Sequence, residues 1–370
     1  MAAPLAWALG AGAQATAPPA ASAFQNLSGR AAAAQQAGQL QEAAGLYQQA
    51  LALRPKWARG WWLLGSLEYD ESDYAGAARA FRQATLLDPG AGTARVMLGL
   101  CEFDLGRYDA ALRDIEAGRR AGTVGDPQFL RVMWYHEGLL RLGRGEFDEA
   151  QAALQRLARA GADNDDALAA LGMAALRIRG RDPNRIAPGA RAAAIEVGNA
   201  EALAARHDRA GAERAFQSAI GEYPRFMNVQ YAYGRFLLDS GEPQAAIAAF
   251  QREIHNTPDH VLARLEIAEY DADANPRRGL PYAQQAVRLD PQLGLGQYLL
   301  GLLLVQLRQP LPAIPHLEKA RRSDPASARV YFVLAKAYAQ AGRTRDASRA
   351  RAEFLRLSKQ RQKPAAEATN

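Results

Sequence analysis

The apolar and polar residues of this chain follow a short pattern that recurs along the sequence. In its first copy the aromatic Tyr47 lies three residues before the small Ala50, and mostly apolar residues continue to Pro55. The second copy runs from Phe81 to Pro89 with the same order of aromatic, small and apolar positions. Apolar residues at this spacing, with a proline where the next segment starts, predict helices joined by short turns.

The pattern continues through the second half of the chain at a nearly constant interval. Its closing prolines there are Pro224, Pro258, Pro291 and Pro325, spaced almost as Pro55 and Pro89 are. A glycine after a large apolar residue stays in phase with them in the first helix of each pair, at Gly65, Gly99, Gly172, Gly234 and Gly301. Glycine allows two helices to approach closely, so these positions predict helical hairpins.

Two further sets of small residues mark the second helix and the turn before it. An alanine opens the second helix at Ala43, Ala77, Ala111, Ala150, Ala212, Ala246, Ala313 and Ala347. A glycine stands in the turn at Gly38, Gly106, Gly145, Gly241 and Gly342. The end of a helix often requires a residue with positive φ, which glycine adopts easily, so the first helix of each pair should end there.

The interval between these prolines, about 34 residues, together with the phased positions resembles the tetratricopeptide repeat family. The resemblance covers about residues 24–358. It implies an all-α fold, a right-handed superhelical α-solenoid of about nine helical hairpins. Composition agrees, because alanine dominates the apolar residues and runs of β-branched residues are nearly absent.

Two places depart from the period. The repeat after Pro258 is one residue short near Asn275. The repeat that starts near Asp165 has a first helix but no recognisable second helix, and residues 179–189 are rich in Pro, Gly and Arg instead. This segment is either a loop that divides the array or a tolerated insertion. The expected organisation is a leader at 1–23, an N-terminal array at 24–178, the loop at 179–189, a C-terminal array with a capping helix at 190–358, and a disordered tail at 359–370.

The first residues resemble a secretory signal peptide of a bacterial protein. An apolar run from Pro4 to Ala13 leads into the pattern Ala13-Gln14-Ala15, after which cleavage would leave a chain starting near Thr16. No Lys or Arg precedes Arg30, so a disordered leader is the alternative. We expect export to the periplasm or cell envelope, with a cytoplasmic location as the alternative. No stretch approaches the roughly 20 apolar residues of a membrane span, and no transmembrane segment is expected.

The net charge of +6 belongs to the C-terminal end of the chain. Eight Lys and Arg residues lie between Arg343 and Lys363, against only Asp346 and Glu353. The remaining chain is close to neutral, which is not the pattern of a basic nucleic-acid-binding body. We expect the basic end to keep the last hairpin soluble, and binding of nucleic acid or an anionic surface is the alternative.

The sequence lacks the patterns expected of a catalytic or cofactor site. His136-Glu137 begins like a zinc-protease motif, but the second histidine position holds Leu140. Cys101 lies on a predicted first helix with no His or Asp at a matching position, which favours a buried structural thiol over a nucleophile. We therefore expect no enzymatic activity, no cofactor and no metal site.

The family resemblance implies that the second, fifth, ninth and twelfth positions of each repeat face a concave groove. The aromatic residues at the fifth and twelfth positions are the expected partner-binding residues, and they are Trp62, Tyr69, Phe103, Tyr135, Tyr231, Tyr298 and Phe332. The alternative for each is packing between hairpins. Chaperone-binding members hold a terminal carboxylate with Lys and Asn at the fifth and ninth positions, and no repeat here has that pair. An aromatic-rich groove instead suits a peptide with apolar anchors.

These observations predict a non-catalytic scaffold that binds partner proteins or peptides in the concave groove, in bacterial envelope assembly or secretion. One alternative is a cytoplasmic regulatory subunit or co-chaperone. The other is a binder of nucleic acid or an anionic surface through the basic C-terminal helix.

Overall fold

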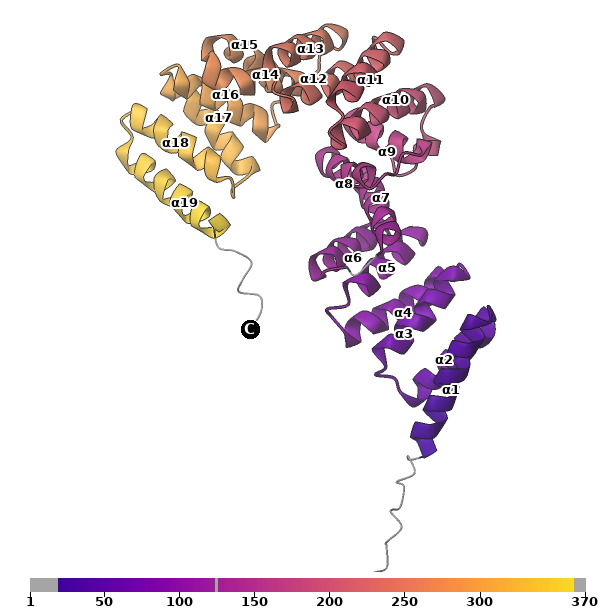
Figure 1. The fold of residues 1–370 in the computed structure, drawn as a ribbon. Helices are drawn as coiled ribbons and strands as arrows, with labels where there is room; N and C mark the ends of the chain where they lie inside the picture. Colours follow the sequence, from indigo (N-terminus) through magenta and orange to yellow (C-terminus); the bar gives the residue numbers. More distant parts are fainter. Residues whose placement is uncertain (1–18, 124–125, 363–370) are drawn as a thin grey trace, which may run out of the picture. The chain divides into compact units, whose positions relative to one another are not determined.

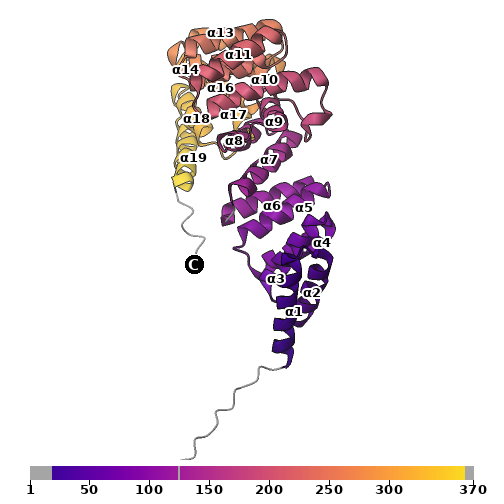
Figure 2. The same cartoon turned by 45° about the vertical axis from the view of Figure 1, so that its right-hand side comes forward.

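The computed structural model describes residues 19–123 and 126–362, and these residues form nineteen α-helices and one short 3-10 helix, without strands (Figure 1). The chain divides into two compact units, Met1–Ala162 and Asp163–Asn370. Figure 2 shows the helices of the two units, α1–α8 and α9–α19, from a second direction. The predicted all-α repeat architecture is confirmed.

The first unit is a stack of hairpins in which each odd-numbered helix packs on the next even-numbered helix. Its hairpins are α1 (Pro19–Gln36) with α2 (Leu40–Leu53), α3 (Ala58–Asp70) with α4 (Tyr74–Leu87), α5 (Gly92–Asp104) with α6 (Tyr108–Ala121), and α7 (Pro127–Arg144) with α8 (Phe147–Arg159).

The second unit begins with α9 (Asp165–Ala175) and the 3-10 helix η1 (Pro183–Arg185), and five hairpins follow. These hairpins are α10 (Pro188–Ala205) with α11 (Arg209–Glu222), α12 (Val229–Asp239) with α13 (Pro243–Asn256), α14 (Val261–Ala274) with α15 (Pro276–Leu289), α16 (Gly294–Gln306) with α17 (Pro310–Ser323), and α18 (Ala328–Gln340) with α19 (Thr344–Gln362).

A glycine of the first helix faces a large buried residue of the second helix in hairpins of both units. A Cβ added at Gly138 or Gly301 would lie 2.5 Å from the Cγ of Leu154 or Leu317, respectively. The large residues at these contacts are fully buried. Gly301, which the repeat pattern predicted, and Gly138, which it did not, therefore set how closely the two helices of their hairpins approach.

The turn inside the hairpins uses a residue with positive φ, as predicted. The five predicted turn glycines have φ between 73° and 78°. The same turn holds Ser72, His207 and Arg308 in three other hairpins, with φ of 62°, 64° and 58°. These three residues therefore adopt a backbone conformation that is unfavourable for any residue with a Cβ.

The hairpin α14–α15 solves the turn differently, because its repeat is one residue short. Asn275 is both the C-cap of α14 and the N-cap of α15. Its side-chain oxygen accepts a hydrogen bond from the backbone N–H of Arg278. The missing residue is thus the one with positive φ, and Pro276 starts the second helix directly.

The region around residues 179–189 differs from the prediction in two respects. The boundary between the units falls at Ala162/Asp163, so this segment lies inside the second unit. In addition, α9 does not lack a partner, because α10 packs against it as well as against α11. The reason is close backbone contact: a Cβ on Gly172 would lie 1.7 Å from the carbonyl oxygen of Ala194, and one on Gly198 would lie 1.9 Å from that of Leu168.

The structure also tests the expected ends of the repeat array. Helix α1 starts at Pro19, within the predicted leader, and Phe24 packs edge-on against Trp57 at 5.0 Å. Helix α19 continues to Gln362, beyond the predicted end at 358. Residues 1–18 of the predicted leader at 1–23, and residues 363–370 of the predicted tail at 359–370, lie outside the described residues.

Replacing Gly172 by Ala should separate α9 from α10, because the added methyl group would meet a backbone carbonyl that cannot rotate away. We expect a loss of about 1–3 kcal/mol in the free energy of unfolding, measured by chemical denaturation. Gly221→Ala in α11 is the control, since no atom lies within 4 Å of a Cβ added there. The control should be neutral or stabilising by up to about 1 kcal/mol. Equal stability of the two variants would contradict the close contact.

Exchanging residues at the positive-φ turn should change stability in opposite directions at two sites. Arg308→Gly relieves the left-handed conformation of a side-chain-bearing residue and should stabilise by about 0.5–1 kcal/mol. Gly342→Ala imposes that conformation on alanine and should destabilise by about 1–2 kcal/mol, although space for the methyl group exists. Thermal melts followed by circular dichroism measure both, and shifts of the same sign would refute the turn assignment.

Candidate functional site

The first helices of neighbouring hairpins form the inner side of each stack. The successive first helices α5 and α7 touch in the first unit, as do α14 and α16 in the second. Among the described helices, no pair of successive second helices comes as close. A stack curves toward the side where its elements are closest, so the first helices line the concave side. We call this side the inner face of each unit.

Four of the predicted binding residues lie on first helices of the first unit, and all four are half-buried. Trp62 and Tyr69 belong to α3, Phe103 to α5 and Tyr135 to α7. Neighbouring aromatic rings support three of them. The ring centres of Trp62 and Phe81 are 5.3 Å apart. Tyr69 packs edge-on against Tyr74, and Phe103 packs edge-on against Tyr108. The first unit therefore carries four half-buried aromatic residues on three successive first helices. We call these four residues the aromatic row.

His136 joins this row, although the sequence pattern did not identify it as a binding residue. Its ring lies edge-on to Phe103 at 4.7 Å and to Tyr135 at 5.7 Å. Its Nδ1 donates to the carbonyl oxygen of Val132 at 2.8 Å, which fixes the tautomer of the neutral ring. Burial lowers the pKa of His136, so the ring is neutral at neutral pH. The sequence signal that could have identified His136 is its place directly after Tyr135, which is at a predicted groove position.

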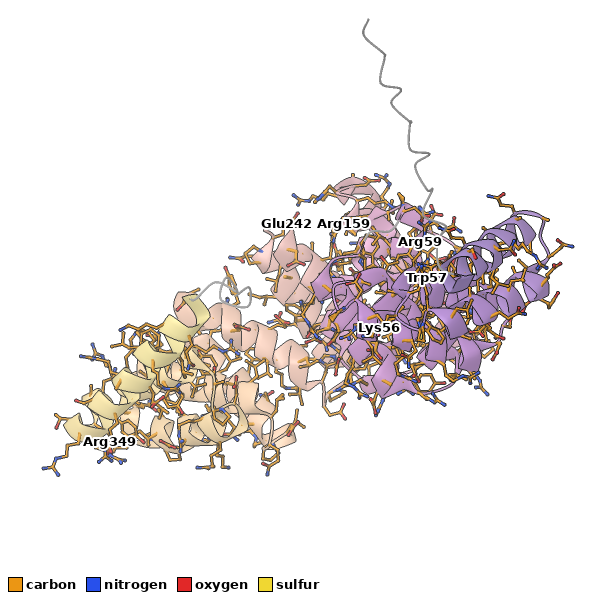
Figure 3. The ribbon with its side chains drawn as sticks, turned by 90° about the horizontal axis from the view of Figure 1, so that it is seen from below. Lys56, Trp57, Arg59, Arg159, Glu242 and Arg349 are labelled. Atoms are coloured by element: carbon orange, nitrogen blue, oxygen red, sulfur yellow. The ribbon has the colours of Figure 1, made fainter. Side chains whose placement is uncertain are left out.

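A cavity of about 370 Å³ lies beside Trp62 in the first unit. Its walls are mainly small residues at the start of α3 and α5, and it is lined by Ala58, Arg59, Trp62, Ala84, Asp88, Gly90, Ala91, Gly92, Thr93, Ala94 and Gly122. A Cβ at Gly92 would lie only 2.3 Å from the carbonyl oxygen of Gly122, so part of the wall is backbone. Figure 3 labels Arg59 near Lys56 and Trp57, and Arg59 is the basic residue of the lining.

Tyr231, the first predicted residue of the second unit, lies in the core. Its side chain is 2% exposed and offers a partner almost no surface. The hydroxyl donates to Oε1 of Glu266 at 3.1 Å, while the guanidinium of Arg177 lies 5.5 Å from the ring centre. Burial raises the pKa of both Tyr231 and Glu266. Hydrogen bonds and packing inside the unit account for this tyrosine.

A buried polar cluster next to Tyr231 was not predicted from the sequence. The carboxylate of Glu253 is fully buried and accepts the backbone N–H groups of Asn228 and Tyr231 at 3.0 and 3.2 Å. His260 donates from Nε2 to the Asn228 side chain, which donates in turn to the carbonyl oxygen of Leu176. The cluster thus joins the end of α9 to the starts of α12 and α14. Its signal was a glutamate at the position that holds Ala50, Ala84, Ala219 and Ala320 in other repeats.

The last two predicted residues lie on α16 and α18 and are paired with cations. The guanidinium of Arg329 lies 4.8 Å from the ring centre of Tyr298, which is half-buried. Phe332 is 43% exposed, and the ammonium group of Lys336 lies 4.4 Å from its ring centre. Both predicted residues of these two helices therefore have a cation against the aromatic ring.

The described residues offer little for bond-making chemistry. Burial raises the pKa of Cys101 to about 12, so its thiol is protonated at neutral pH and is not activated as a nucleophile. Within residues 19–123 and 126–362, no three His, Cys, Asp or Glu side chains gather as a metal site would require. In the same part of the chain no helix combines the length and hydropathy needed to cross a membrane.

Comparison with solved structures gives several distant similarities. The chain is similar in structure to MamA from Desulfovibrio magneticus RS-1, with 19% identity over 46% of this chain and 97% of that one, at a TM-score of 0.42. A tetratricopeptide repeat protein from Parabacteroides merdae aligns with 15% identity over 76% of this chain and 99% of that one, at a TM-score of 0.34. Yeast Tom70 aligns with 14% identity over 91% and 92% of the two chains, at a TM-score of 0.32.

The family assignment rests on a sequence match rather than on these structures. No curated protein sequence matches the chain significantly. The tetratricopeptide repeat model, however, matches residues 29–78, 62–123, 135–196, 197–261 and 298–347, which together exceed half of the chain. The chain therefore belongs to the tetratricopeptide repeat family.

Proposed function

We propose that the protein is a non-catalytic scaffold that binds an apolar segment of a partner protein on the inner face of its first unit. Tetratricopeptide repeats support protein interaction as the general role. The observation that carries the finer proposal is the aromatic row together with the cavity beside Trp62. Tyr and Trp bury much area on binding while losing little conformational freedom, so accessible rings of this kind dominate binding hot spots.

The second unit is the weaker candidate for this role. Tyr231 is buried and hydrogen-bonded to Glu266, and a cation covers one face of Tyr298. A partner would have to displace these interactions before contacting the rings, and the cost of doing so reduces affinity. The cavity beside Trp62, in contrast, has walls of Ala and Gly that can receive one apolar side chain.

Truncating the aromatic row should weaken binding without unfolding the protein. We expect Trp62→Ala and Tyr135→Ala each to reduce affinity for the native partner by about thirtyfold, the effect of a hot spot of about 2 kcal/mol. Partners are first identified by crosslinking and mass spectrometry with the wild-type chain from its native host. Affinity and thermal melts are then measured for each variant.

Two further variants test the assignment from both sides. Ala91→Leu adds a side chain at the cavity and should block binding while removing no existing contact. Tyr231→Ala should instead cost about 3–5 kcal/mol of stability, as expected for a buried aromatic residue, and spare binding below its melting temperature. Binding that depends on Tyr231 in its folded variant, but not on Trp62 or Tyr135, would move the site to the second unit.

We also propose that the protein is exported and acts in envelope assembly or secretion. The support is the apolar run from Pro4 to Ala13 and the Ala13-Gln14-Ala15 pattern that follows it. N-terminal sequencing of protein isolated from its native host should give a chain that starts near Thr16. Retention of Met1 or Ala2 on every molecule would contradict export by this route and favour the cytoplasmic alternative.

A further inference from the structure

The hairpin α18–α19 ends the described stack of the second unit, and one of its faces lacks the cover that the earlier hairpins have. Helix α14 packs against α13, α16 packs against α14 and α15, and α18 packs against α16 and α17. In each case the first helix of the next hairpin covers the previous one. Within the described residues, which end at 362, no helix follows α19 in this way. The surface of α18–α19 that corresponds to these contacts is thus not covered by a helix of the described residues.

Comparison with the preceding hairpin, α16–α17, shows how the sequence of this surface has changed. Leu317 is fully buried in α17, and the corresponding residue in α19 is the exposed Arg351. Leu302 of α16 likewise corresponds to Lys336 of α18, which is exposed. A leucine of α16–α17 is therefore replaced by an exposed cation of α18–α19 at both positions, and these substitutions give the hairpin a basic character.

Apolar side chains nevertheless remain on the same surface. Phe332 is 43% exposed and Leu355 is 51% exposed. The ring of Phe354 lies 5.3 Å from that of Phe332, at the position where the previous hairpin has the small, buried Ala320. We call Phe332, Lys336, Arg351, Phe354 and Leu355 the terminal face. It combines a strip of apolar groups with a cation on each of its two helices.

We propose that the terminal face docks an acidic amphipathic helix of a partner protein. A helix is indicated because the same place in the preceding hairpins is occupied by one. Acidic residues are indicated because Lys336 and Arg351 would pair with them. A carboxylate that draws the ammonium group of Lys336 away from the Phe332 ring would let apolar residues of the partner contact Phe332 as well as Leu355. The large ring of Phe354 keeps a docked helix further out than a following repeat would lie.

A second copy of this chain is a poor occupant of the terminal face. Two copies related by a twofold axis would present the same surface to each other, so Lys336 and Arg351 would face like charges. Helix α19 adds Arg345, Arg349 and Lys359, all exposed, and Figure 3 shows Arg349 on the outer surface of the second unit. Charge complementarity thus favours an acidic partner over self-association.

The test uses the full chain and a synthetic amphipathic helix of five turns with a leucine stripe flanked by glutamates, labelled with fluorescein. Fluorescence anisotropy should show binding of this peptide, and about tenfold weaker binding of the same peptide with lysines in place of glutamates. Phe332→Ser and Lys336→Glu should each weaken binding of the acidic peptide by about tenfold or more. Leu355→Ser provides a second apolar variant should Phe332→Ser fail to fold, as judged by circular dichroism.

A control variant separates a specific surface from general attraction to positive charge. Arg277→Glu changes the net charge of the chain by the same amount as Lys336→Glu, but at an exposed position on α15. It should leave peptide binding unchanged. Equal losses of peptide binding in Lys336→Glu and Arg277→Glu would overturn the proposal. So would binding of anionic lipid vesicles or RNA that is as strong as binding of the acidic peptide and is weakened by both variants.

Two other outcomes would also overturn it. Sedimentation that shows self-association of the wild type, abolished by Phe332→Ser, would assign the terminal face to a second copy. Failure of the acidic peptide to bind at up to millimolar concentration would leave the face as a solubilising cap. The proposal involves none of the residues of the aromatic row. Trp62→Ala should therefore leave binding of the acidic peptide intact, and each function can fail without the other.

Discussion

The distance between the two helices of a hairpin is the constraint on which the rest of this structure depends. At Gly138, Gly234 and Gly301 a Cβ would lie 2.5 Å from the large side chain opposite. That side chain fills the space between the helices only because the glycine leaves it. The next first helix then packs on the closed hairpin, and its groove positions take their place on the inner face. A wider spacing in one hairpin would displace the helix that follows, so the local contact determines where the binding residues lie.

Much of this could be predicted from the sequence, because it is local and periodic. The repeat period, the glycine in the first helix of a hairpin and the turn with positive φ all recur at fixed positions. The contact of α9 with α10 could not be predicted in this way, since Gly172 and Gly198 lie on either side of a segment without the period. The burial of Tyr231 was also hidden, because Arg177, which follows the end of α9, and Glu266 of α14 reach it from distant parts of the sequence. A deviation from the period, such as Glu253 at an alanine position, was the only local sign of the polar cluster.

The side chains on the inner faces of the two units make different kinds of contact with one another. In the second unit, hydroxyl, carboxylate and guanidinium groups form bonds among themselves, as Tyr231 and Glu266 do. Such a surface is already compensated, so a partner gains little by contacting it. In the first unit the rings of Phe103 and His136 meet edge to edge. Edge contacts hold the rings in place and leave area for a partner, which makes this face suited to recognition.

The hairpin α18–α19 differs from the preceding hairpin at several positions that are apolar or small there. In the preceding hairpin this position holds the fully buried Leu317, and an exposed leucine there would place apolar area in water. Arg351 at the matching position stays solvated, and Phe354 fills the gap left for a following helix by packing on Phe332. These changes discourage another hairpin of this family from stacking, because its apolar first helix would desolvate two cations without compensation. Carboxylates of a partner would compensate the same cations, so these residues also select what can bind to the terminal face.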